Sequence, residues 1–230
     1  MIEIIPAILS RDYEDLKNKI ALVRGFVPVV QVDICDGKYE KNFTWPFGNS
    51  GFDAHFQKIL NEEEGMPFWE DVDFELDLMV SDAVENFDIY SKLGPRRIVF
   101  HLGAIGNLEE FKHFLEGMDN YIRDVIEIGI AVVPDENLEK VSPLINNVDF
   151  IQCMGIDKIG FQGQDFDKRV LGQIEKLRKD FPDLVISVDG GVSFDTAPAL
   201  ISAGASRLVI GSAIFNIDDI IGTIEEFRKL

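Results

Sequence analysis

The chain has 230 residues, 46% of them hydrophobic, which fits a single domain over residues 1–230 with one large core. Its formal net charge of −19 would repel the phosphates of nucleic acid, so we expect no nucleic-acid partner. Two cysteines, Cys35 and Cys153, are too few for a disulfide framework or a paired-cysteine metal site. No apolar run approaches the length of a membrane span and the start lacks a basic leader, so we expect a cytoplasmic protein without a membrane partner.

Segments with strand and helix patterns alternate along the chain. Apolar or alternating runs predict strands, at residues 2–9, 29–34, 74–80, 97–102, 128–133, 148–154, 184–188 and 207–210. Amphipathic patterns between them predict helices, at residues 11–24, 54–60, 81–93, 107–127, 136–145, 165–181 and 217–230. Ser10 is expected to cap the first helix, and Ser81 and Asp82 to open the third. This alternation predicts an α/β protein whose parallel eight-stranded core closes into a single (β/α)8 TIM barrel.

Residues 38–73 form the least regular part of the chain. They include Trp45, Pro46 and Phe47, several glycines and an acidic run. The aromatic content favours a long active-site loop with a short helix over a linker between domains. The stretch from Trp45 to Phe47 is compatible with a lid over a site and equally with packing.

Two glycine-containing turns follow the last two expected strands. Gly190 and Gly191 come directly after Asp189, and Gly211 and Ser212 come directly after the final strand. Glycine at such a turn lets the backbone approach a ligand closely, and the N–H groups that open the next helix face an anion. In barrels of this class, the turns after strands seven and eight form a phosphate site. Because the chain is so acidic, that site must act through local N–H groups rather than a basic field.

Active-site side chains of such a barrel sit at the carboxyl ends of its strands. The strand ends here carry Asp33, Asp77, His101 and Asp189, and Gln31 shares the inward face of Asp33. Any one acidic residue at a strand end could be a helix cap or a solvated turn, but we expect this set to converge. His101 could be a base or a hydrogen-bonded structural histidine.

Other residues near the strand ends have apolar or turn-forming character. Met79 and Met154 are typical of a core, with the wall of a binding pocket as the alternative. The run of Gly160, Phe161, Gln162 and Gly163 follows the sixth strand, next to the expected phosphate site. Asp36 is expected to serve the turn before Gly37.

Asp33 and Asp189 on opposite walls would suit an epimerisation that shuttles protons. One carboxylate removes the proton α to a carbonyl, and the other group returns a proton to the opposite face. The enediolate intermediate requires a metal ion or preorganised donors to hold its negative charge.

Ordered segments along nearly the whole chain match one known family. They read PAILS at 6–10, VDICDG at 32–37, LMV at 78–80, FHL at 100–102, GFQGQDF at 160–166, VDGGV at 188–192, AGA at 203–205 and GSAIF at 211–215. On these segments the chain resembles the ribulose-phosphate 3-epimerases. The resemblance implies that Asp33 and Asp189 are the acid/base pair and also bind a divalent metal. It implies further that the glycine-rich turns hold a substrate phosphate, that the ligand is a phosphorylated sugar and that the protein is a homo-oligomer.

The departures from this family are concentrated in the expected site. The two metal-binding histidines of the family fall at Gln31 and Asp77. Their loss removes the nitrogen ligands that favour zinc or iron. Gln31, Asp33, Asp77 and Asp189 could still form an all-oxygen site, which suits Mg²⁺ or Mn²⁺. The alternative is a site without metal, in which repulsion would keep at least one carboxyl protonated near neutral pH.

These observations favour a sugar-phosphate epimerase, an isomerase that interconverts ketopentose 5-phosphates such as ribulose and xylulose 5-phosphate. One alternative is a non-catalytic barrel that binds a sugar phosphate. The other is a metal-assisted lyase or decarboxylase on a related phosphate-binding barrel. Those barrels carry an Asp-x-Lys-x-x-Asp strand motif, and Met79 stands at the lysine position between Asp77 and Asp82, so this alternative ranks last.

Overall fold

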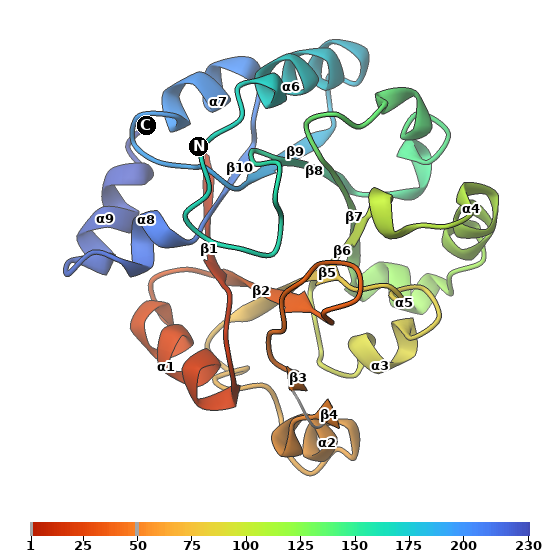
Figure 1. The fold of residues 1–230 in the computed structure, drawn as a ribbon, viewed down its shortest axis with the longest axis vertical. Helices are drawn as coiled ribbons and strands as arrows, with labels where there is room; N and C mark the ends of the chain where they lie inside the picture. Colours follow the sequence, from red (N-terminus) through yellow and green to blue (C-terminus); the bar gives the residue numbers. More distant parts are fainter. Residues whose placement is uncertain (1, 49–50) are drawn as a thin grey trace.

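A computed structural model describes residues 2–48 and 51–230; residues 49 and 50 of the irregular 38–73 region lie outside it. Parallel strands close into a barrel with the order β1-β10-β9-β8-β7-β6-β5-β2 (Figure 1). These strands are β1 (Glu3–Ile8), β2 (Val29–Cys35), β5 (Asp73–Met79), β6 (Arg97–His101), β7 (Glu127–Val132), β8 (Phe150–Met154), β9 (Val185–Asp189) and β10 (Arg207–Ile210). The predicted (β/α)8 barrel is confirmed.

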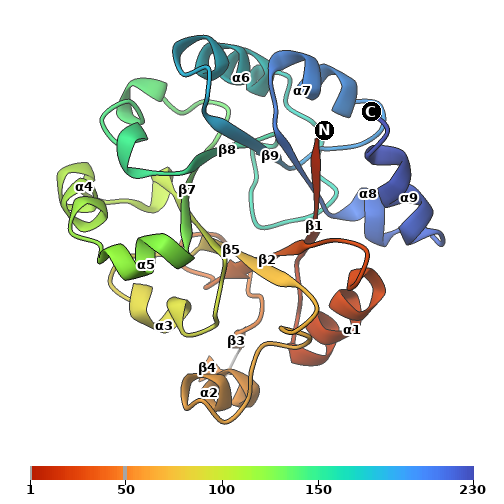
Figure 2. The ribbon, with the colours of Figure 1, turned by 180° about the vertical axis from the view of Figure 1, so that it is seen from behind.

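Helices and short 3-10 turns surround the barrel (Figures 1 and 2). The helices are α1 (Tyr13–Val23), α2 (Ala54–Leu60), α3 (Phe87–Ser91), α4 (Leu108–Glu116), α5 (Asn120–Val125), α6 (Arg169–Asp180), α7 (Ala197–Ala203), α8 (Ser212–Phe215) and α9 (Ile220–Phe227). The 3-10 turns are η1 (Leu102–Ala104), η2 (Leu138–Lys140) and η3 (Ile145–Asn147). A small antiparallel pair, β3 (Phe47–Gly48) and β4 (Gly51–Phe52), lies outside the barrel. Over the described ranges, no helix is both long enough and apolar enough to cross a membrane.

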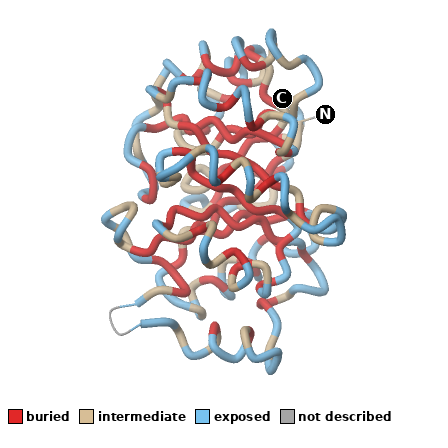
Figure 3. Tube along the Cα trace, turned by 90° about the vertical axis from the view of Figure 1, so that its right-hand side faces the viewer, coloured by how far each residue is buried: buried red, intermediate tan, exposed pale blue. Residues whose placement is uncertain are grey.

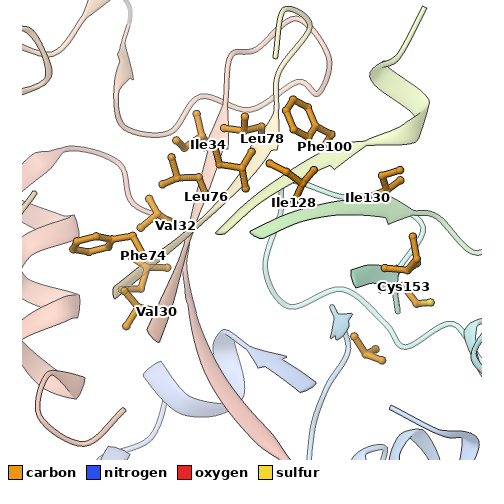
Figure 4. Close-up of a cluster of buried hydrophobic side chains, with 14 of the residues drawn as sticks. Val30, Val32, Ile34, Phe74, Leu76, Leu78, Phe100, Ile128, Ile130 and Cys153 are labelled. Atoms are coloured by element: carbon orange, nitrogen blue, oxygen red, sulfur yellow. The ribbon is translucent and has the colours of Figure 1, made fainter. Parts of the chain in front are cut away.

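The main hydrophobic core lies between the strands and the helices. Side chains alternate along each strand, so every second residue faces outward into this layer. Figure 4 shows such outward residues, among them Val32, Leu76 and Phe100, all of which are fully buried. Figure 3 shows that the buried segments concentrate in the strands at the middle of the molecule. Burial of this layer holds the ring of strands closed and fixes which side chains face the interior.

The interior of the barrel is closed at the amino ends of the strands by an ion cluster. Arg97 contacts Glu75, Glu3 and Glu127 at 3.5, 3.1 and 3.1 Å, and Arg207 contacts Glu3 and Glu127 at 2.9 and 3.1 Å. Burial raises the pKa of Glu75 to about 7, although both arginines oppose the rise. The cluster occupies this end of the barrel, so the opposite end is left for a site.

Several predicted helix boundaries are wrong, each for a local reason. Asp12, not Ser10, caps α1: its side chain accepts from the backbone N–H of Asp15 at 2.8 Å. Ser81 does not open a helix, because its N–H and its Oγ both donate to Oδ2 of Asp36, each at 2.8 Å. The following helix, α3, therefore begins only at Phe87.

Three further helical predictions also differ from the structure. The expected helix at 136–145 is absent from the described residues there and is replaced by η2 and η3. Pro143 explains this, because proline lacks an N–H and disfavours helical geometry in the residue before it. The pattern at 107–127 divides into α4 and α5 after Gly117, and the helix expected from 165 begins at Arg169.

The aromatic stretch of the 38–73 region serves packing. Trp45 is 1% exposed and meets Phe56 of α2 edge-on, with ring centroids 5.8 Å apart. Asp36 serves the adjoining turn, as expected, because its Oδ1 accepts from the N–H groups of Lys38 and Tyr39. This region is therefore anchored to the barrel near the carboxyl end of β2.

Capping of α1 gives a test of the local structure. Asp12→Ala should lower the free energy of unfolding by about 1 kcal/mol, because the N–H of Asp15 loses its acceptor. Ser10→Ala is the matched control: the buried Oγ of Ser10 has no partner among the described residues, so its removal should cost nothing. Urea unfolding of both variants measures the difference, and a larger loss for Ser10→Ala would show that the cap is misassigned.

Candidate active site

Three aspartates from three strands meet at the carboxyl-end face of the barrel. Asp33 on β2 and Asp77 on β5 are direct register partners, and Asp189 is the last residue of β9. One carboxylate oxygen from each lies within 4.8 Å of the others. All three side chains point into the barrel, because side chains alternate along a strand and each aspartate occupies an inward-facing position. The structure therefore brings together the acidic residues that the sequence singled out.

The side chain of Gln31 bridges two of these aspartates. Its Nε2 donates to Oδ1 of Asp33 at 2.8 Å and to Oδ2 of Asp189 at 2.9 Å. Gln31 is fully buried, and no described residue provides a hydrogen-bond partner for its Oε1. The sequence predicts Gln31 as an oxygen ligand to a metal, but its N–H groups, not its oxygen, face the carboxylates.

His101 holds the third aspartate. Its Nε2 lies 2.8 Å from Oδ1 of Asp77, and both side chains are buried. The ring of Tyr39 lies over His101, with centroids 5.8 Å apart. Oδ2 of Asp77 is buried and has no partner in the described part of the chain. His101 thus fixes one oxygen of Asp77 and leaves the other available for a ligand.

Asp33 and Asp189 hold protons more tightly than exposed carboxyl groups do. Burial raises the pKa of Asp33 to about 7, the charge of Asp77 adds to the rise, and the hydrogen bond from Gln31 opposes it. Burial also raises the pKa of Asp189, with further contributions from Asp33 and Asp77. The two groups interact with each other, so their protonation is linked near neutral pH.

A cavity lies above the carboxylates, and most of the predicted site residues line it. Its lining contains Asp33, Asp189, Met79, Met154, Gly160, Phe161, Gln162, Gly163, Gly190, Gly191, Gly211 and Ser212. Gln31 and Asp77 are fully buried and do not belong to the lining. The remaining lining residues were not predicted as part of the site; they are Ala7, Leu9, Ile156, Gln164, Val192 and Val209. Most of them are apolar, and only their positions at or just beyond strand ends could have indicated them.

The turn after β9 requires glycine at both positions. Gly190 and Gly191 have φ angles of 94° and 66°, in the left-handed region. A Cβ on Gly190 would lie 2.7 Å from the side chain of Ile156, and one on Gly191 would lie 2.9 Å from Cα of Phe166. The backbone is therefore bare at this point of the cavity, as a phosphate site needs.

The segment after β8 covers the turn after β10. Nε2 of Gln162 lies 3.4 Å from the carbonyl oxygen of Ala7, and a Cβ on Gly211 would come within 2.6 Å of the same nitrogen. Nδ2 of Asn42 donates to the carbonyl oxygen of Gly160 at 2.5 Å. The loops that follow β2 and β8 thus meet beside the cavity.

The carboxylates fit a divalent cation that prefers oxygen ligands. Asp33, Asp77 and Asp189 offer oxygens close enough to share one ion, and Oδ2 of Asp77 has a free lone pair. Gln31 does not fit as a fourth ligand in this orientation, because N–H groups do not coordinate a metal. Three of the four predicted ligands are therefore placed to hold an ion.

Comparison with known proteins identifies what this chain is similar to. Residues 3–215 match the family described as the ribulose-phosphate 3 epimerase family. A ribulose-phosphate 3-epimerase of Bacillus subtilis is 28% identical, over 99% of this chain and 99% of its own. One of Schizosaccharomyces pombe is 27% identical, over 93% of this chain and 87% of its own.

Solved structures of low identity share the architecture. KGPDC from Streptococcus mutans has a TM-score of 0.68 and 13% identity, and the match covers 100% of this chain and 96% of that one. The 3-hexulose-6-phosphate synthase of Salmonella typhimurium has a TM-score of 0.63 and 12% identity, covering 99% and 97%. At these identities the likeness supports the barrel fold alone.

The raised pKa of Asp33 predicts a pH-dependent cost to stability. A carboxyl with a raised pKa binds extra protons in the folded state, so its contribution to stability falls as pH rises from about 4 to about 7. Asp33→Asn should therefore be more stable than wild type by on the order of 2 kcal/mol at about pH 8, and by much less at about pH 4.

Urea unfolding of chelator-treated protein at both pH values measures this difference. Asp183→Asn, at an exposed aspartate, is the control and should show no such pH dependence. If Asp33→Asn were no more stable than wild type at about pH 8, then charging the buried Asp33 carboxyl would not lower the free energy of unfolding, contrary to this prediction.

Proposed function

Because the chain belongs to the ribulose-phosphate 3-epimerase family, we propose that it is a sugar-phosphate epimerase that interconverts ribulose 5-phosphate and xylulose 5-phosphate. The observation that carries this proposal is the position of Asp33 and Asp189. Both carboxylates line one cavity, and both accept from the same amide nitrogen. The same cavity holds the glycine turns at 190–191 and 211–212, so an acid/base pair and a phosphate site face one ligand.

The proposed reaction moves one proton off C3 and another onto its opposite face. The carboxylate of one aspartate takes the C3 proton. The electron pair of the C–H bond forms the C2–C3 double bond of an enediolate, while the π pair of the C2 carbonyl moves onto its oxygen. The carboxylic acid of the other aspartate then delivers a proton to the other face of C3. The carbonyl re-forms when C3 is protonated. The raised pKa values of Asp33 and Asp189 suit this, since one group must be protonated while the other is not.

The enediolate carries negative charge, which the site must stabilise. Asp33, Asp77 and Asp189 would hold a divalent ion, for which their oxygen ligands favour Mg²⁺ or Mn²⁺ over zinc or iron. When bound, such an ion supplies positive charge next to the substrate oxygens. His101 would keep Asp77 in place for this role through its hydrogen bond to Oδ1.

We propose that the substrate phosphate binds between the turns at 190–191 and 211–212. The described residues that line the cavity include no lysine or arginine, so the donors for a phosphate would be backbone N–H groups and neutral side chains such as Ser212. Gln162 lies against Gly211 and has to move aside when phosphate enters. Phe161 and Gly163 belong to the same segment and would close over the bound group.

Exchange with solvent deuterium tests the reaction. Incubation with ribulose 5-phosphate in deuterated water, with Mg²⁺, Mn²⁺ or Zn²⁺ supplied in turn, should place deuterium at C3. Asp33→Asn and Asp189→Asn should each lower kcat by about 1,000-fold, because each removes one proton-transfer group. Asp183→Asn is the matched control and should retain the wild-type rate. Thermal stabilisation by sugar phosphates without any exchange would favour a non-catalytic binding barrel instead.

The phosphate site is tested by adding a methyl group to it. Gly211→Ala should raise KM for ribulose 5-phosphate by about tenfold, because the new Cβ intrudes where the phosphate would approach the backbone. kcat should change little, since the aspartates are untouched. The control is Gly172→Ala on α6, where a Cβ meets nothing within 4 Å. An unchanged KM for Gly211→Ala would place the phosphate elsewhere.

A further inference from the structure

The two aspartates of the proposed acid/base pair lie on strands that are not neighbours. β2 and β9 are separated in the barrel by β1 and β10, so no hydrogen-bond ladder joins them directly. Their carboxylates also repel each other when both are charged. The backbone places them at one face of the barrel, but the ladder alone does not set their separation. A specific contact has to do so.

Gln31 makes that contact on both sides. An amide nitrogen carries two N–H donors, and Nε2 of Gln31 lies within 2.8 Å of Asp33 and 2.9 Å of Asp189. Each carboxyl group keeps at least one acceptor oxygen whether or not it is protonated, so an N–H group directed at each suits both aspartates. The amide is neutral, so it adds no charge to a cluster that already contains several acidic groups.

The surroundings of Gln31 favour one fixed orientation. Its backbone is held in β2, where it is the register partner of Ala7 on β1 and Glu75 on β5. Its side chain is fully buried, and Oε1 finds no partner among the described residues. Turning the amide over would replace two donors with an acceptor facing two carboxylates. The N–H groups therefore stay toward the aspartates as long as no cation sits between them.

We propose that Gln31 is the positioning residue of the acid/base pair, holding Asp33 and Asp189 at a fixed separation so that the pair is assembled without a bound metal ion. This inference rests on the proposed function for its consequence in catalysis. Its geometric content is independent of that function, since it states which atom of Gln31 faces the carboxylates. A metal that binds the three aspartates would add positive charge to the site but would not be needed to bring the pair together.

Two substitutions and one control separate this role from general packing. Gln31→Met keeps the length of the side chain and removes both N–H groups. Gln31→Glu keeps the shape and turns the donor into an acceptor. Gln152→Met is the control, because Gln152 is another fully buried glutamine of the barrel, on β8, whose Nε2 lies 3.8 Å from Sδ of Met154. Chelator-treated full-length proteins are compared by kcat and KM for ribulose 5-phosphate and by calorimetric titration with Mn²⁺.

Turnover gives the first result. Compared with wild type under the same metal conditions, Gln31→Met should lose about 100-fold in kcat with little change in KM, because the pair is misplaced. Gln152→Met should stay near wild type. If chelation abolishes turnover and Mn²⁺ restores wild type and Gln31→Met alike, the ion rather than the amide assembles the pair, and the inference is wrong while the proposed function stands.

Absence of turnover in every protein, wild type included, would overturn the proposed function. Mn²⁺ affinity would still test the orientation of the Gln31 amide, because it does not depend on turnover. Gln31→Glu should bind Mn²⁺ at least about tenfold more tightly than wild type, because two N–H groups facing the ligands give way to a carboxylate. Equal affinity for the two proteins would overturn the inference, since it would show that the N–H groups of Gln31 do not oppose a cation there.

Discussion

Closure of the barrel imposes the constraint on which the rest of this structure depends. Once eight parallel strands form a ring, every second side chain of each strand is placed in an interior without bulk water. Glu75, Asp33 and Asp77 are then buried and Asp189 is partly buried, although a charged carboxylate in such a place costs free energy unless it is paired or protonated. The chain meets this demand differently at the two ends of the barrel.

At the amino ends of the strands, arginines neutralise the buried acids. Arg97 and Arg207 contact Glu3, Glu75 and Glu127, and the result is a closed ionic layer. At the carboxyl ends, the aspartates contact amide and imidazole groups instead of arginines. Gln31 donates to Asp33 and Asp189, and His101 contacts Asp77. Both arginines oppose the rise in the pKa of Glu75 with positive charge, whereas the amide of Gln31 opposes the rise at Asp33 without adding charge. The amino end of the barrel is therefore closed by ion pairs, and the carboxyl end holds the candidate active site.

Much of this architecture could be predicted from the sequence, because it follows from short-range patterns. Alternating apolar runs indicated the barrel, and inward-facing positions indicated the convergence of Asp33, Asp77 and Asp189. Helix ends were less predictable. Asp12 and Ser10 are both residue types that cap helices, and Ser81 donates its hydroxyl to Asp36, which is distant in sequence. The orientation of Gln31 could not be predicted either. It depends on a contact with Asp189 that only the closed barrel creates.

Gln31 and Asp77 occupy the positions at which the family resemblance implies metal-binding histidines, and the two residues differ in what they present to a ligand. Asp77 keeps an oxygen available for a cation, whereas Gln31 presents donors. The glycine turns line the same cavity beside this altered cluster, which is why we propose a sugar phosphate as the ligand. Under the proposed function, the replacement at Gln31 would change how the acid/base pair is held and not the atoms on which it acts.

The most direct test is a crystal structure with a pentitol 5-phosphate, a reduced ketose phosphate that cannot form an enediolate. We expect its phosphate to lie against Gly190, Gly191, Gly211 and Ser212, and C3 to lie between the carboxyl groups of Asp33 and Asp189, with one on each face. A complex with both carboxyl groups on one side of C3, or with the phosphate outside the glycine turns, would contradict this expectation.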